Sequence, residues 1–215
     1  MNRLSVAIDG PAGVGKSTIA KIIAKKLDLM YINTGSMYRA VTLKALEANI
    51  DYKDVKKLVE LVDSMDIHFE NDELFLNGKN INDKITMPEI SKRVSEYASV
   101  KEVRVKLVEL MRAMSNKYNV IMDGRDIGTV VLKEAPYKFF LVASAKERAN
   151  RRYKELIEKG LEVNYDEILE DIIKRDEYDS TREVDPLRKA DDAIEVDTTY
   201  LTIEEVASEI LKNIK

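Results

Sequence analysis

The chain has 215 residues, of which 45% are hydrophobic, and this suits one α/β domain with a small insertion. It has no cysteine, which excludes disulfides, thiol nucleophiles and cysteine-bound metals. A net charge of −4 argues against a general nucleic-acid-binding surface, and no apolar run approaches the length of a membrane span. We expect a soluble cytoplasmic protein without a signal peptide, because the first strand begins within a few residues of the start.

A strand, a glycine-rich segment and a helix follow one another at the start of the chain. Residues 4–8 are apolar enough for a buried strand, and residues 18–27 carry apolar side chains at helical spacing. Between them lies the pattern G-x-x-x-x-G-K-[ST], in which backbone N–H groups and the lysine bind phosphate oxygens and the hydroxyl ligates Mg²⁺. The predicted metal ligand is Ser17. The predicted phosphate-binding residues are Gly10, Pro11, Ala12, Gly13, Val14, Gly15, Lys16, Ser17 and Thr18.

The rest of the chain alternates between strand and helix patterns. Further strands are expected at residues 30–33, 119–123, 138–142 and 193–196. Helices are expected at about residues 37–48, 54–65, 88–98, 101–116 and 165–177, and after the predicted capping boxes Ser144 with Glu147 and Thr202 with Glu205. These elements predict an α/β fold of the P-loop NTPase type, with a five-stranded parallel sheet and helices on both faces.

Residues 66–81 have a different pattern. Two short apolar runs flank a polar tetrapeptide, and Asn77-Gly78 then offers a second tight turn. This segment predicts a small antiparallel meander inserted into the α/β chain.

The chain lacks the residues of several common reaction types. A GTPase would need Asn-Lys-x-Asp to read guanine, and the nearest segment, residues 116–119, lacks the Asp. His68 is the only histidine, and its place in the meander favours a structural role. Phosphoryl transfer to a phosphate acceptor needs no such base, because the acceptor oxygen is already ionised. It does need cationic groups that converge on one cleft.

Arginines occur where such a cleft is expected. Arg39 follows the second strand and Arg125 ends the third, and ligands of open α/β sheets bind at the carboxyl ends of strands. A single arginine is usually a solvated surface charge, but these two positions favour a phosphate site. Two helical faces carry further sets at helical spacing: Arg148, Arg151 and Arg152, and Arg175, Asp179 and Arg182.

Five segments together resemble one family, the bacterial cytidylate kinases. They are residues 8–17, 34–39 (Thr-Gly-Ser-Met-Tyr-Arg), 123–131 (Asp-Gly-Arg-Asp-Ile-Gly-Thr-Val-Val), 147–152 and 175–182. The resemblance covers essentially the whole chain, and the insertion at about residues 64–84 matches a feature of these enzymes. One departure is Asn33-Thr34, where many relatives have Asp-Ser; Thr34 keeps the hydroxyl, so we expect substrate binding there to be tuned but not lost.

The resemblance implies ATP-dependent phosphorylation of CMP and dCMP, with Mg²⁺, by direct in-line transfer. It implies that the acceptor phosphate is held by Arg39, Arg125 and Arg182, that cytosine is read by Ser95, Arg104 and Asp126, and that the ribose lies near Arg175 and Asp179. Arg151 and Arg152 match the start of a lid over ATP. The expected catalytic set is Lys16, Arg39, Arg125, Arg151, Arg152 and Arg182.

The chain is expected to be a single domain spanning residues 1–215. Its core would comprise residues 1–33, 101–147 and 183–215, with a nucleotide-acceptor region at about 34–100 and a lid at about 148–182. We expect a monomer that binds neither nucleic acid nor membrane. Two alternatives stay open: a kinase for another small acceptor, such as a different nucleoside monophosphate or shikimate, and a regulatory ATPase that transfers nothing. Asp123 either orients the water shell of the metal or only closes its strand.

Overall fold

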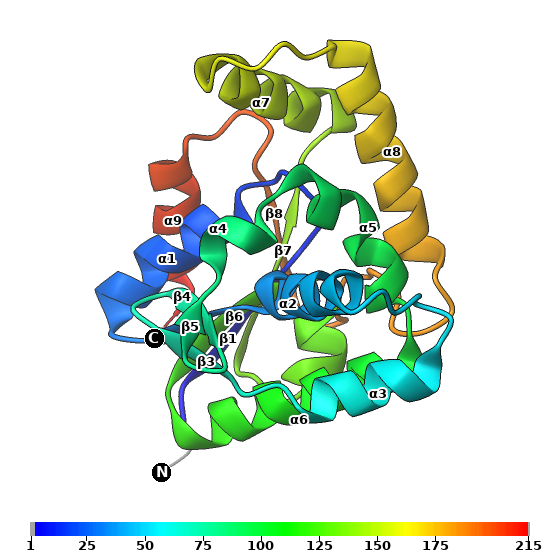
Figure 1. Cartoon of the computed structure of the whole chain (residues 1–215). Coiled ribbons are helices and arrows are strands. Elements are labelled where there is room, and N and C mark those ends of the chain that lie inside the picture. The colour runs from blue at the N-terminus through cyan, green and yellow to red at the C-terminus, as the bar shows by residue number, and fades with distance from the viewer. Residues whose placement is uncertain (1–2, 215) are drawn as a thin grey trace.

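The computed structural model describes residues 3–214 and contains two sheets, of which the larger is fully parallel (Figure 1). Its strands run in the order β2-β6-β1-β7-β8. They are β1 (Ser5–Asp9), β2 (Met30–Asn33), β6 (Val120–Gly124), β7 (Tyr137–Val142) and β8 (Ile194–Asp197). Every pairing in this sheet is parallel, so the carboxyl ends of all five strands meet at one edge. The predicted five-stranded α/β fold is confirmed.

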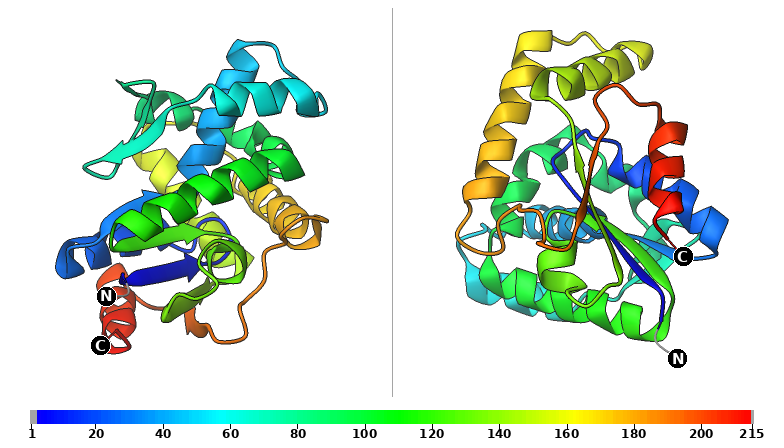
Figure 2. Two further views of the ribbon diagram at one scale, coloured as in Figure 1. Left: turned by 90° about the horizontal axis from the view of Figure 1, so that it is seen from below. Right: turned by 180° about the vertical axis from the view of Figure 1, so that it is seen from behind.

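Helices cover both faces of the parallel sheet (Figure 2). Side chains of a strand alternate between the two faces, so strands with consecutive apolar residues need to be covered on both. In β1, Val6 and Ile8 belong to the core formed with α1 (Lys16–Leu27) and α9 (Ile203–Lys212). Ala7 belongs to the opposite core. That second core is formed with α2 (Thr34–Glu47), α3 (Val55–Asp63), α5 (Pro88–Ala98) and α6 (Lys101–Lys117).

The predicted meander is confirmed as a separate three-stranded antiparallel sheet. It consists of β3 (Ile67–Glu70), β4 (Glu73–Leu76) and β5 (Lys79–Asn80), and a short helix, α4 (Asn82–Ile85), follows it. The β3–β4 turn has Asn71 and Asp72 at φ 48° and 66°, as the tight hairpin turn requires. Leu74 and Leu76 are buried in the same core as α2, so the insertion packs on the side of the molecule where α2 lies.

The two predicted capping boxes have different outcomes. Thr202 and Glu205 form the complete box at α9, with each side chain bonded to the other's backbone N–H. At α7 (Ala145–Glu158), Ser144 accepts the N–H of Glu147 at 3.2 Å. The Glu147 carboxylate instead pairs with Arg151 at 3.1 Å, one helical turn later. Only half of the second box therefore forms.

Several helical elements differ from expectation. Helix α2 begins at Thr34, three residues before the predicted start, because the Asn33 side chain accepts the backbone N–H of Ser36 at 2.9 Å and caps it. Helix α8 (Tyr165–Thr181) extends beyond residue 177. A short π-helical segment, η1 (Ile127–Val131), follows β6 where no element was expected.

Helices α7 and α8 pack together beyond the carboxyl edge of the sheet (Figure 1). The contact includes the rings of Tyr153 and Tyr165 in an edge-on arrangement and an ion pair between Arg148 and Asp176. Within residues 3–214, no helix has both the length and the apolar character that crossing a bilayer would require.

Candidate active site

A cavity opens at the carboxyl edge of the parallel sheet, between the phosphate loop and helices α2, α5 and α8. Its lining includes six cationic side chains and three carboxylates, an excess of three positive charges in a chain whose net charge is −4. The cations are Lys16, Arg39, Arg104, Arg125, Arg175 and Arg182, and the carboxylates are Asp123, Asp126 and Asp179. A concave site with this imbalance attracts anions.

The phosphate loop has the backbone shape that its pattern predicts. Gly10 has a φ of 145°, and a Cβ there would lie 2.2 Å from the carbonyl oxygen of Leu141, so only glycine fits. Gly15 precedes α1 in the left-handed conformation and provides no side-chain cap, which leaves the first N–H groups of α1 available to an anion. The Lys16 ammonium reaches back to the carbonyl oxygen of Pro11 at 2.6 Å. Burial, and then the charge of Arg125, lower the pKa of Lys16 well below its usual value.

Ser17 lies in a hydrogen-bond network with the end of β6. Its hydroxyl donates to Asp123 Oδ2 at 2.9 Å, and the buried Tyr31 hydroxyl donates to Asp123 Oδ1 at 2.9 Å. Asn33 donates to the Tyr31 hydroxyl at 3.0 Å while its own side-chain oxygen caps α2. The network therefore links the phosphate loop to the start of the helix that carries Arg39.

This network also fits a hard cation. A hydroxyl and a carboxylate are oxygen ligands of the kind Mg²⁺ prefers, and Mg²⁺ in phosphoryl-transfer sites takes few protein ligands and keeps water and phosphate oxygens. Among the residues that the structure describes, no cluster of three or more His, Asp or Glu side chains suited to a metal occurs. Ser17 with Asp123 is a pair at the phosphate loop that could hold the cation, because its hydroxyl and carboxylate lie 2.9 Å apart.

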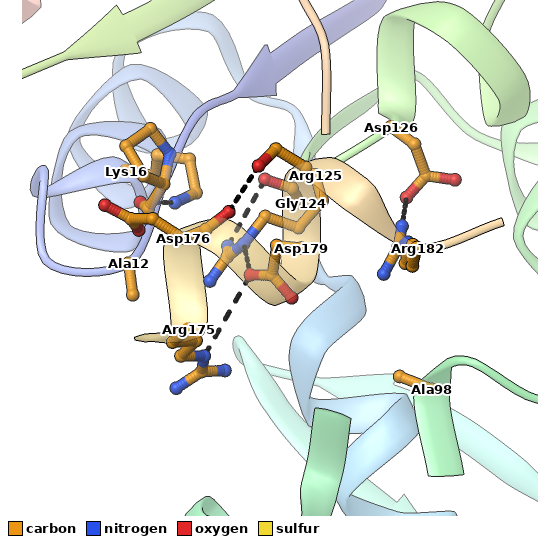
Figure 3. Close-up of polar contacts among 12 residues, drawn as sticks. Ala12, Lys16, Ala98, Gly124, Arg125, Asp126, Arg175, Asp176, Asp179 and Arg182 are labelled. Carbon is orange, nitrogen blue, oxygen red and sulfur yellow. Dashed lines mark hydrogen bonds and ion pairs between the residues drawn. The ribbon is translucent and has the colours of Figure 1, made fainter. Parts of the chain in front are cut away.

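Three arginines of the cavity lack full compensation by carboxylates, and Figure 3 shows two of them, Arg125 and Arg175, directed at the same carboxylate, Asp179. Arg39 makes no hydrogen bond or ion pair with any other residue in the described part of the chain. Arg125 donates to Asp179 Oδ2 at 2.8 Å, whereas Arg175 lies 4.0 Å from the same oxygen and its buried Nε has no hydrogen-bond partner within residues 3–214. Burial, followed by the charge of Arg125, lowers the pKa of Arg39 and lowers that of Arg175 to about 10. An anionic ligand would relieve this repulsion.

A second group of charges lies at the α5 side of the cavity. Arg104 is fully buried and donates to Asp126, and Arg182 donates to the other oxygen of Asp126 at 3.4 Å. Burial raises the pKa of Asp126, and the neighbouring Arg104 opposes that rise. Ser95 lines the same cavity. The three residues that the family resemblance assigns to cytosine therefore line one cavity, although they are up to 31 positions apart in the chain.

The remaining predicted substrate residues also line the cavity, whereas two of the predicted catalytic residues do not. Thr34, Arg39, Arg125, Arg175, Asp179 and Arg182 all contribute to the wall. Arg151 and Arg152 do not lie among the lining residues. Arg151 donates to the carbonyl oxygens of Thr198 and Thr199, and Arg152 is 49% exposed and pairs with Glu155 at 2.8 Å. Their role over ATP stays a prediction.

Several contacts that shape the site carried no signal in the sequence. Asp9 is buried at the end of β1, and its carboxylate accepts the backbone N–H groups of Ile127 and Gly128, each at 2.7 Å. Arg148, on the same helix as Arg151, is buried; it pairs with Asp176 and donates to the carbonyl oxygen of Ala12 at 3.0 Å. These contacts join residues far apart in the chain, and no local spacing would have indicated them.

The fold and the site define a P-loop kinase, in which the phosphate loop lies next to a second anion-binding site lined by cationic side chains. Comparison with known proteins gives the particular family. The sequence profile of the cytidylate kinases matches residues 6–215, and the chain belongs to this family.

Relatives named cytidylate kinase are similar along nearly their whole length. The protein of Clostridium perfringens (strain SM101 / Type A) is 72% identical over 98% of this chain and 97% of its own. That of Clostridium acetobutylicum (strain ATCC 824) is 59% identical over 99% and 98%, respectively. Among solved structures, shikimate kinase from Bacteroides thetaiotaomicron has a TM-score of 0.51 at 12% identity, covering 98% of both chains. This last likeness shows the fold alone.

Proposed function

We propose that this protein phosphorylates CMP with ATP, and that it also accepts dCMP. In the reaction an oxygen of the CMP phosphate forms a bond to the γ-phosphorus, and the bond from that phosphorus to the β,γ-bridging oxygen breaks, so the products are CDP and ADP. The observation that carries the proposal is the excess of positive charge in the cavity next to the phosphate loop, to which Arg39, Arg125 and Arg182 contribute. It supports a second phosphate-bearing ligand in addition to ATP.

Each half of the cavity would then hold one nucleotide. The N–H groups at the start of α1 and the Lys16 ammonium bind the β- and γ-phosphates of ATP. Arg39, Arg125 and Arg182 bind the phosphate of CMP. As charge builds on the transferring group, these cations lie on its two sides and stabilise it, so no general base is needed. Arg151 and Arg152 act with the lid, whose closure excludes water.

Ser17 and Asp123 would hold Mg²⁺, Ser17 as a ligand and Asp123 through the water shell. When bound, the ion would supply positive charge that neutralises the phosphates of ATP. The chain's own contribution is orientation: Tyr31 fixes one oxygen of Asp123 and leaves the other directed at the Ser17 hydroxyl.

The base would be read at the buried α5 side of the cavity. Cytosine presents an amino group that needs an acceptor, and Asp126 offers one. Its O2 and N3 need donors, which Arg104 and Ser95 supply. Uracil has a carbonyl in place of the amino group and would face the Asp126 carboxylate unfavourably. Arg175 and Asp179, which also line the cavity, would contact the ribose.

The proposal includes the division of the chain into a core (residues 1–33, 101–147 and 183–215), an acceptor region (about 34–100) and a lid (about 148–182). It also includes a monomer in the cytoplasm. Proteolysis with and without nucleotides tests the division, because lid closure should protect residues 148–182 from cleavage.

An acceptor panel tests the function. ADP release is measured by a coupled assay with CMP, dCMP, UMP, AMP and shikimate, and without acceptor. CMP and dCMP should give the highest kcat/KM, with little ADP released when no acceptor is present. Preference for AMP or shikimate would indicate a kinase of another acceptor. ADP release that does not depend on any acceptor would favour a regulatory ATPase.

A further inference from the structure

Asp185 contacts two arginines of the cavity through different atoms. Its carboxylate accepts Arg104 Nε at 2.8 Å, and its backbone carbonyl oxygen accepts Arg182 Nε at 2.8 Å. It lies in the segment after α8, with a φ of 48° in the left-handed region that few residues other than glycine adopt. The side chain is 28% exposed, at the outer end of a group of otherwise buried charges.

Arg104 is the buried member of that group, with a side-chain exposure of 2%. A guanidinium has five N–H groups on three nitrogens, and each nitrogen of Arg104 already has an acceptor. Nε donates to Asp185, one terminal nitrogen to the carbonyl oxygen of Ala98 at 3.0 Å, and the other to Asp126. The guanidinium plane is thus fixed from three segments of the chain, and two N–H groups remain for a ligand.

The charges in this group balance only when Asp185 is included. Arg104 and Arg182 are cations, and both donate to Asp126. Without Asp185, one carboxylate would serve two guanidinium groups. Arg104 Nε would lose its acceptor, and the guanidinium would gain most by turning onto Asp126 as a two-pronged pair. That arrangement would occupy the lone pairs of Asp126 that face the cavity.

We propose that Asp185 is a positioning residue for base recognition. By holding Arg104 Nε, it keeps the guanidinium in one orientation and leaves acceptor capacity on Asp126 for the exocyclic amino group of the base. The inference rests on the proposed function, in which Arg104 and Asp126 read cytosine. It adds to that function a residue outside the cavity wall, on the segment that leaves the lid.

The test compares Asp185→Ala with Asp185→Asn and with a matched control, Glu183→Ala. Glu183 is an exposed acid two positions earlier, so its loss changes the same charge in the same segment. KM for CMP should rise about tenfold in Asp185→Ala, and the ratio of kcat/KM for CMP over UMP should fall about tenfold, equivalent to ~1.4 kcal/mol. KM for ATP should not change, and Glu183→Ala should behave as the wild type.

Asp185→Asn keeps an oxygen that can accept Arg104 Nε but removes the charge, so its ratio of kcat/KM for CMP over UMP should fall between those of the wild type and Asp185→Ala. If the alanine variant does not fold, the asparagine variant decides the question. A purely structural role would lower the melting temperature and leave the CMP-to-UMP ratio unchanged, and that outcome in the folded variants overturns the proposal. If the wild type itself does not phosphorylate CMP, the proposed function fails instead, and the two failures are distinguishable.

Discussion

Asp9 connects the two halves of the cavity, and its replacement by Asn offers a sharp test of the structure. Its carboxylate oxygens accept the N–H groups of Ile127 and Gly128 and so fix the loop that carries Arg125 and Asp126. Asp9→Asn keeps the shape of the side chain but turns an NH₂ group toward one of these donors. One buried backbone N–H then loses its acceptor, which costs ~1–3 kcal/mol.

The magnitude of the pH effect follows from the burial of Asp9. Burial raises its pKa from 3.8 to about 7, even though the two backbone hydrogen bonds act in the opposite direction. Between these values the folded protein keeps a proton that the unfolded chain has lost, so the free energy of unfolding decreases as the pH rises. A difference of about three pH units at 1.36 kcal/mol each gives a loss of ~4 kcal/mol, complete above pH ~7.

The assay is urea unfolding of the wild type and Asp9→Asn at pH 5, 6, 7 and 8, a range that includes the raised pKa of Asp9. Asp191→Asn, at an exposed position, is the control. The wild type should lose stability relative to Asp9→Asn as the pH rises. Asp126 and Lys16 also face Asp9 and are present in both proteins, so the comparison of the two proteins removes most of their contribution. In parallel, the decrease of kcat/KM for CMP below pH ~7 should be larger in the wild type than in Asp9→Asn, because a protonated Asp9 no longer offers two acceptor oxygens to Ile127 and Gly128. A stability difference that stays constant with pH would refute the reasoning.

Three further changes test other parts of the site. Lys16→Ala removes the ammonium beside the transferring phosphoryl group and should lower kcat by at least ~100-fold in the coupled assay; near-normal turnover would contradict its role. Asp126→Asn replaces one acceptor oxygen by a donor, so the preference for CMP over UMP should decrease, and an unchanged ratio would argue against base reading there. Tyr31→Phe removes a buried hydrogen bond to Asp123 and should lower the free energy of unfolding in urea by ~1–3 kcal/mol. It should also raise the Mg²⁺ concentration needed for half-maximal activity. Identical values for the wild type and the variant would show that Tyr31 does not orient Asp123.

Features encoded by local spacing were predictable from the sequence. The phosphate loop follows from the positions of Gly10, Gly15 and Lys16 between a strand and a helix. The meander follows from its turn residues, and the cap at Thr202 follows from its spacing to Glu205. In each case the residues that decide the conformation lie within a few positions of one another, so the physical cause is visible in a short window.

Features decided by long-range contacts were not predictable. Asp9 bonds to residues 118 and 119 positions away, and Asp185 bonds to Arg104 81 positions away.

One local feature was also missed. The early start of α2 was not predicted because Asn33 also fits the end of a strand, and its capping role shows only in the hydrogen bond to Ser36. The resemblance to a family, and not the spacing, brought Ser95, Arg104 and Asp126 into one proposed set.

The central claim is that the cavity holds two nucleotides and transfers phosphate between them. The most direct measurement is the fate of the γ-phosphate of labelled ATP incubated with CMP and Mg²⁺. The account predicts that the label appears in CDP, in amounts equal to the ADP formed, with little label in inorganic phosphate. Label recovered mainly as inorganic phosphate, whether or not CMP is present, would contradict it.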